Sequence, residues 1–122
     1  AAYVSLGQLR YLSSLQFCSA VMGNSSSGII EVPSFGIPTI NIGDRQRRRL
    51  HADSVISCSN NEEQIDIALQ KALSTEFLDE IKKIKNPYEG EHTSSRIMQI
   101  IRQRLAEGIN LKKEFYDIEV RE

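Results

Sequence analysis

The stretch VMGNSSSGIIEVPSFGIPTINIGDRQRRR, Val21 to Arg49, gives the clearest indication of the fold class of this chain. An apolar run over 19–23 predicts a short buried strand that ends at a glycine. The serines that follow are typical helix N-caps and predict a short helix, which Pro33 must end or kink because proline has no N–H to donate. The β-branched run 38–42 predicts a second strand. Two short strands joined through a helix indicate a parallel pair.

Further elements are predicted on both sides of this stretch. Leucines at near-helical spacing predict an amphipathic helix from about Leu6 to Phe17, and DSVIS, 53–57, is a candidate third strand. Helical patterns follow at 65–73, with Asn60 and Glu63 in capping-box-like spacing, at 77–84, and at 97–105, starting near Thr93 and ending at Gly108. The predicted fold class is therefore α/β, with a parallel sheet flanked by helices. We expect one domain over 1–107 and a tail over 108–122.

The composition and net charge of the chain argue against nucleic-acid-binding, membrane and metal-binding proteins. The chain has 122 residues, 40% hydrophobic and 25% charged, with a formal net charge of -1, so no global field favours nucleic acid or an acidic membrane. Its two cysteines, Cys18 and Cys58, lack metal-ligand spacing, and we expect them reduced. No signal peptide and no apolar run near the ~20 residues of a membrane span is visible. We therefore expect a cytoplasmic protein without metal or cofactor. The absence of an initiator Met is consistent with a fragment.

The loop after the first predicted strand has the chemistry of an anion site. In a parallel α/β sheet, ligands bind at the carboxyl ends of the strands. Ser25 and Ser26 offer hydroxyls, the first helical N–H groups have no intrahelical partner, and Gly28 allows close backbone approach. An equally weighted alternative is that one of these serines only caps a helix.

The arginines after the second predicted strand favour the anion site. Adjacent parallel strands place their carboxyl ends side by side, so Arg45 or Arg49 could reach the same anion with a planar fork of donors. We expect Arg47 and Arg48 to be solvated or to face another chain. The alternative for the whole run is a surface basic patch.

Other candidate catalytic or nucleotide-binding sites have weaker support in the sequence. The serine loop does not fit the nucleophile elbow G-x-S-x-G, and the chain has no G-x-G-x-x-G and no P-loop lysine. His51 and His92 have no partners in the sequence pattern that would make either a catalytic base. Glu31 suits a ribose diol if it points to the ligand, but its position alone slightly favours an exposed helical glutamate.

The stretch GNSSSGIIEVPSFGIPTINIGDRQRRR resembles the nucleotide-binding segment of hydrolysing UDP-N-acetylglucosamine 2-epimerases, and NPYEGEHTSSRI resembles that family's second signature. The resemblance covers nearly all of 5–105. It implies part of the C-terminal, Rossmann-like domain of a two-domain enzyme of GT-B-like architecture. It also implies that Ser25 and Ser26 bind the UDP diphosphate, that Glu31 holds the ribose, and that Arg45 and Arg49 lie near the phosphates.

The chain departs from the family at three positions. Glu89 and Glu91 stand where relatives usually have the glycines of a Gly-x-Gly turn, and Arg48 stands where many relatives have glycine. Glycine at such positions permits a positive φ or a close backbone approach.

The resemblance implies epimerisation at C2 with loss of UDP. UDP leaves by anti elimination to give a 2-acetamidoglucal, and water then adds to give N-acetylmannosamine. The acid and base at C2 belong to an N-terminal domain that is missing from this sequence, so we expect no turnover by the chain alone. The implied partners are a UDP-sugar, that missing domain and, in the full-length enzyme, further copies in a homo-oligomer. UDP-N-acetylglucosamine and a UDP-diacetamido sugar both stay open as substrates. The alternatives are a non-catalytic nucleotide-binding module and a fragment of a GT-B glycosyltransferase.

Overall fold

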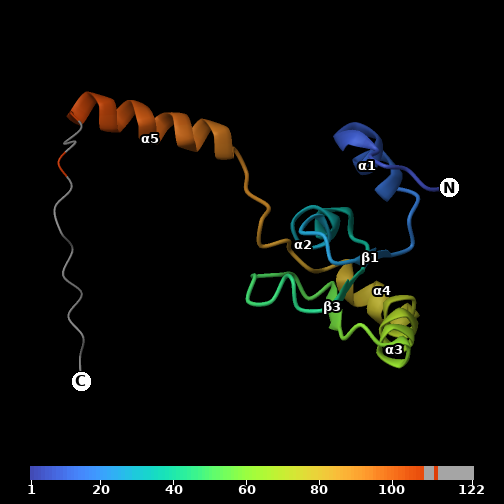
Figure 1. The fold of residues 1–122 in the computed structure, drawn as a ribbon. Helices are drawn as coiled ribbons and strands as arrows, with labels where there is room; N and C mark the ends of the chain where they lie inside the picture. Colours follow the sequence, from blue (N-terminus) through green and yellow to red (C-terminus); the bar gives the residue numbers. More distant parts are fainter. Residues whose placement is uncertain (109–111, 113–122) are drawn as a thin grey trace, which may run out of the picture. The chain divides into compact units, whose positions relative to one another are not determined.

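The computed structural model describes residues 1–108 and Lys112. The chain divides into two compact units, Ala1–Glu89 and Gly90–Glu122. The first unit contains a sheet and most of the helices (Figure 1). The predicted tail 108–122 lies outside the described residues except at its first residue and Lys112, so the predicted boundary between 1–107 and that tail stays a prediction.

The first unit is built on a three-stranded parallel sheet in the order β1-β2-β3. Its strands are β1 (Val21–Gly23), β2 (Thr39–Ile42) and β3 (Val55–Cys58). Met22 pairs with Ile40, and Ile40 pairs with Ile56. The predicted parallel sheet and its candidate third strand are confirmed, although β1 begins at Val21 rather than at residue 19.

The helix predicted after the serines is split by its proline. α2 covers only Ser27–Ile30, and a 3₁₀ helix, η1, covers Val32–Phe35. Pro33 lies in the first turn of η1, where a missing N–H leaves no hydrogen bond unmade. Gly36 ends η1 in the left-handed region, with φ 65°. The chain thereby turns sharply into β2 and returns parallel to β1.

Helices flank β2 on both faces of the sheet, because successive side chains of the strand point to opposite faces. Ile40 packs with Ala68 and Ala72 of α3 (Glu62–Ala72), and this cluster is part of the hydrophobic core. On the other face, the Thr39 hydroxyl donates a 2.7 Å hydrogen bond to the Gly28 carbonyl of α2. The sheet is therefore flanked by helices, as predicted, and the arrangement is consistent with part of a Rossmann-like domain.

The remaining helices of the first unit are α1 (Gly7–Leu15) and α4 (Thr75–Ile81), both near their predicted ranges. The predicted cap of α3 is wrong by one residue. Asn61, not Asn60, is the N-cap, and its side-chain oxygen accepts a 2.9 Å hydrogen bond from the Gln64 N–H. Asn61 has the extended backbone that an N-cap requires, so it satisfies an N–H that the helix leaves without a partner.

The described part of the second unit is dominated by one helix. α5 covers Thr93–Glu107, starts at the predicted threonine and ends before Gly108. None of its residues is buried. His92 precedes it with a left-handed φ of 55°, whereas Glu89 and Glu91 are not among the residues with positive φ. Across residues 1–108 and Lys112, no helix has the length and apolar character needed to cross a membrane.

Candidate functional site

The serine loop joins the carboxyl end of β1 to α2, as predicted. Ser26 occupies the N-cap position of α2, but its side chain makes no capping hydrogen bond. The Ser25 hydroxyl accepts only a long contact, 3.4 Å, from the Ser27 N–H. Ser26 thus occupies the cap position without a capping hydrogen bond, and Ser25 makes one long contact to the start of the helix, so both interpretations of these serines stay open.

The three serines of the loop differ in whether their hydrogen-bond donors are already used within the protein. The Ser27 hydroxyl donates to the phenolic oxygen of Tyr11 in α1. Within residues 1–108, the backbone N–H groups of Ser25 and Ser26 enter no hydrogen bond. Since α2 has only four residues, its dipole is small. The unused N–H groups of Ser25 and Ser26 are therefore the groups of this loop that could bind an anion.

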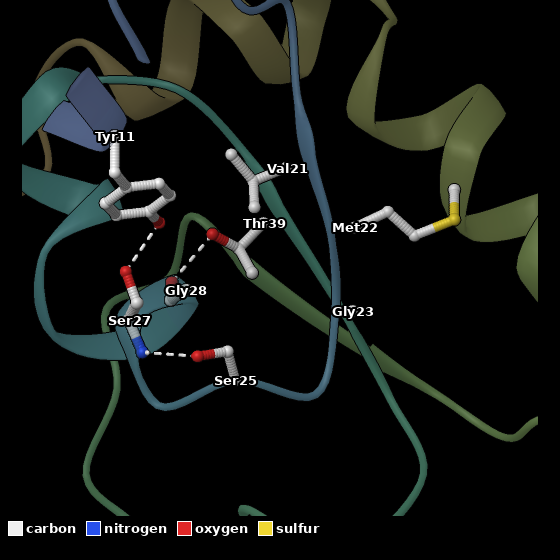
Figure 2. A pocket seen from close by; sticks show the side chains of 8 residues that line it. All are labelled: Tyr11, Val21, Met22, Gly23, Ser25, Ser27, Gly28 and Thr39. Carbon is white, nitrogen blue, oxygen red and sulfur yellow. Dashed lines mark hydrogen bonds between the residues drawn. The ribbon is translucent and has the colours of Figure 1, made fainter. Parts of the chain in front are cut away.

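A cavity of about 390 Å³ lies beside this loop, and we name it the serine cavity (Figure 2). Figure 2 shows the Tyr11–Ser27 pair at one side of it, Ser25 near the Ser27 nitrogen, and the Met22 side chain pointing away from that pair. Its lining residues come from α1, β1, the serine loop, α2 and β2: Tyr11, Val21, Met22, Gly23, Ser25, Ser27, Gly28 and Thr39.

The structure explains Gly28 by packing, which the sequence interpretation did not foresee. A Cβ at this position would lie 2.8 Å from the Thr39 Cγ2 atom, closer than real Cβ contacts allow. Thr39 cannot easily move, because it is buried and its hydroxyl is bonded to the Gly28 carbonyl. Gly28 therefore lets α2 approach β2. Its expected role, close backbone approach to a ligand, is not needed to explain the glycine.

The arginine loop, residues 43–50, follows the carboxyl end of β2. Its four guanidinium groups are exposed. Within residues 1–108 the ion pairs are Lys82–Asp79 and Arg104–Glu107, so no carboxylate of that range pairs with an arginine of this loop. Gln46, at the centre of the loop, is 5% exposed and its Nε2 donates a 2.8 Å hydrogen bond to the Asn24 carbonyl. The arginine loop is thereby tied to the serine loop.

A second cavity, of about 330 Å³, lies under the arginine loop, and we name it the arginine cavity. Arg49 lines it, together with Arg47 and Arg48, which were expected only to be solvated or to face another chain. Arg45 is not among its lining residues. Arg48 has a left-handed φ of 68°, a backbone conformation that favours glycine.

Glu31 lies at the junction of α2 and η1 and is half-buried. Within residues 1–108 its carboxylate has no hydrogen-bond or ion-pair partner. It lines a third cavity, of about 620 Å³, formed with the chain around the start of α1. Tyr11 and Ser27 line both this cavity and the serine cavity, so their hydrogen-bonded pair separates Glu31 from Ser25.

The five predicted site residues thus lie in neighbouring places and not in one cavity. Ser25 lines the serine cavity, Glu31 the third cavity and Arg49 the arginine cavity, whereas Ser26 and Arg45 line none of these three. Their assignment to a ligand stays a prediction.

Sequence interpretation gave no structural role to three residues. Tyr11 lies inside the predicted helix from Leu6 to Phe17, and its hydroxyl oxygen accepts a hydrogen bond from Ser27, 16 positions away in the sequence. Asn86 and Tyr88, in the second signature, reach the segments around both Glu31 and Arg49. Asn86 donates to the Ile30 carbonyl, and the Tyr88 hydroxyl donates to the Leu50 carbonyl, each at 2.8 Å.

Comparison with known proteins decides the family. The family model described as UDP-N-acetylglucosamine 2-epimerase matches residues 1–102. This chain belongs to that family. The resemblance noted on the serine loop, the arginine loop and the second signature is therefore confirmed.

Individual relatives of this 2-epimerase family member are similar over most of its length. It is 34% identical over 115 residues to the polysialic acid biosynthesis protein P7 of Escherichia coli, covering 94% of this chain and 29% of that protein. It is 47% identical over 73 residues to the GDP/UDP-N,N'-diacetylbacillosamine 2-epimerase (hydrolyzing) of Campylobacter jejuni, covering 60% of this chain and 18% of that protein.

A third relative carries the family's name. The chain is 28% identical over 117 residues to the UDP-N-acetylglucosamine 2-epimerase of Neisseria meningitidis serogroup B, covering 96% of this chain and 31% of that protein. The 2-epimerase family member described here therefore spans less than a third of the length of these curated relatives. Within residues 1–108 and Lys112, no three His, Cys, Asp or Glu side chains are grouped to hold a metal ion.

Proposed function

We propose that this chain is the nucleotide-binding part of a hydrolysing 2-epimerase acting on a UDP-linked 2-acetamido sugar. In this proposal it forms part of the C-terminal domain of a GT-B-like, two-domain enzyme. The serine and arginine loops bind the diphosphate, and the Glu31 carboxylate accepts hydrogen bonds from the ribose diol. Family membership supports the class of reaction, and the relatives' names support the class of substrate.

The observation that carries the proposal is the bond from the Gln46 amide to the Asn24 carbonyl, at 2.8 Å. It joins a loop with unused N–H donors to a loop of exposed guanidinium groups that no described carboxylate neutralises. Both loops leave the same edge of the sheet, because β1 and β2 are parallel neighbours. A diphosphate matches this pairing, since it presents several acceptor oxygens and two or more negative charges.

In the proposed reaction, the diphosphate site would stabilise the negative charge that develops on the departing UDP. The bond between the sugar C1 and the diphosphate oxygen breaks, the C2 proton leaves to a base, and a 2-acetamidoglucal and UDP form. Water then adds across the double bond, and the product is the free sugar with C2 inverted. Negative charge grows on the departing β-phosphate, so preorganised donors lower the barrier, and loss of one such donor typically costs about 10²–10³ in rate.

Titration calorimetry of the 122-residue chain with UDP and with uridine tests the proposal. We expect UDP to bind more tightly than uridine, and the difference to shrink as salt is raised, because exposed charges are screened. Arg102→Ala removes an exposed arginine from α5 and serves as the matched control, with UDP affinity unchanged. A folded chain that binds UDP no better than uridine contradicts the proposal.

A second assay addresses catalysis. We expect the chain by itself not to release UDP from UDP-N-acetylglucosamine, since the proposed acid and base at C2 belong to the other domain. Turnover by the purified chain would show that the C2 chemistry lies within these residues.

A further inference from the structure

We propose that the turn Asn86-Pro87-Tyr88 is a clamp that positions the two sides of the nucleotide site. Asn86 holds the backbone around Glu31, and Tyr88 holds the end of the arginine loop next to Arg49. The inference rests on the proposed function, because it assigns positioning roles to residues that do not themselves touch the nucleotide.

Asn86 is the buried half of the clamp, at 5% exposure. Its Nδ2 donates two hydrogen bonds of 2.8 Å, one to the Ile30 carbonyl and one to the Ser34 hydroxyl. These acceptors lie on either side of Glu31 in the sequence, at the end of α2 and within η1. The asparagine therefore fixes the junction that carries the Glu31 carboxylate.

Tyr88 is the exposed half of the clamp. Its hydroxyl donates a 2.8 Å hydrogen bond to the carbonyl of Leu50, the residue after Arg49. Leu50 is 65% exposed, so its side chain contributes little packing to hold this part of the loop. A single exposed hydrogen bond contributes little to the stability of the whole fold, but its loss is enough to change where an exposed loop lies.

The two halves are held rigidly to each other. The Tyr88 N–H donates to the Asn86 Oδ1 at 3.0 Å, and the Glu89 N–H donates to the Asn86 carbonyl, also at 3.0 Å. Pro87 stands at the position of such a turn where its restricted φ is favoured. Because one rigid turn bonds segments 56 and 38 positions away, it sets the spacing between them.

The Tyr88→Phe variant tests the clamp, because it removes one hydroxyl and leaves the ring. Gln70→Met is the matched control, since it removes one exposed side-chain hydrogen bond, to Asp66 on α3. We expect Tyr88→Phe to weaken UDP binding roughly three- to tenfold, with uridine affinity unchanged and the unfolding midpoint lowered no more than in Gln70→Met. In an Arg49→Ala background the same change should have little further effect, because both act through one loop.

Limited digestion with trypsin gives a readout independent of the ligand. We expect Tyr88→Phe to speed cleavage within 45–49 relative to cleavage after Arg102, and Gln70→Met to leave this ratio unchanged. An unchanged ratio together with unchanged UDP affinity overturns the clamp. If the wild-type chain folds but does not bind UDP, the proposed function and the ligand part of this inference fail together, and the trypsin ratio still decides whether Tyr88 holds the loop.

A second variant tests the Asn86 half without leaving a buried carbonyl unpaired. Ser34→Ala removes one of the two Asn86 acceptors at an exposed position. Since ribose is common to both ligands, we expect UDP and uridine affinities to fall by a similar factor, about two- to fivefold. A loss confined to UDP contradicts the assignment of Asn86 to the Glu31 side.

Discussion

The side-chain amide of Gln46 bonds the main-chain carbonyl of Asn24, and this contact joins loops that lie 22 positions apart in the sequence. Both residues follow strands whose carboxyl ends are neighbours in the sheet. Gln46 is 5% exposed although arginines flank it on both sides, so it is the buried residue of an exposed loop. Its Oε1 has no partner among the described residues, so the bond from Nε2 is the hydrogen bond that the Gln46 side chain contributes there.

The first prediction concerns this contact. Gln46→Met keeps the length of the side chain and removes both the donor and the unpartnered oxygen. We expect the free energy of unfolding to change by less than about 1 kcal/mol, because the lost bond is offset by the lost unsatisfied acceptor. UDP affinity should fall about tenfold as the loops separate. Calorimetry and urea unfolding measure the two effects, with the exposed Gln64→Met as control. Wild-type UDP affinity in the variant would show that the contact does not organise the site.

The second prediction concerns Glu31. Its carboxylate is half-buried and unpaired among the described residues, so Glu31→Ala should leave the fold intact. Hydrogen bonds to a charged group are worth about 1.5–3 kcal/mol, so we expect UDP and uridine affinity to fall by one to two orders of magnitude alike. Glu80→Ala, at an exposed position of α4, is the control. Unchanged affinity for both ligands would remove the ribose assignment.

The third prediction separates the two arginines assigned to the phosphates. Arg45→Ala and Arg49→Ala should each weaken UDP binding at low salt, by about three- to tenfold, and less at high salt. Uridine affinity should not change. Because Arg49 lines the arginine cavity and Arg45 does not, we expect the larger loss for Arg49. Equal losses for UDP and uridine, measured by calorimetry, would argue against phosphate contacts.

The fourth prediction follows from backbone strain at Arg48, whose φ is 68°. A left-handed conformation costs an L-residue about 1–2 kcal/mol, whereas glycine loses about 0.5–1 kcal/mol more backbone entropy on folding. Arg48→Gly should therefore change the free energy of unfolding by between zero and about 1.5 kcal/mol in the stabilising direction, measured by urea unfolding. Arg47→Gly, at a position without positive φ, should lose about 0.5–1 kcal/mol. If Arg48→Gly destabilises as much as Arg47→Gly, strain at this turn is excluded.

Much of the fold was predictable because local patterns agree with the tertiary arrangement. The β-branched run before Gly43 became β2, Pro33 ended α2, and the pattern after Thr93 became α5. The errors occurred where neighbouring residues share a propensity. Asn60 and Asn61 are equally good caps by type, and only the backbone turn selects the second. Family membership was also predictable, because the serine and arginine loops form one long motif.

The order of the elements, the parallel sheet and the side chains available at the carboxyl ends of its strands could be read from the sequence, because they depend on periodicity and on residue type. Which of those side chains meet depends on the folded chain. Ser27 is used by Tyr11, Gly28 is needed by Thr39, and Gln46 rather than an arginine reaches the serine loop. Such contacts join residues 11 to 22 positions apart, and their partners depend on how the helices pack across the sheet, which no local pattern encodes.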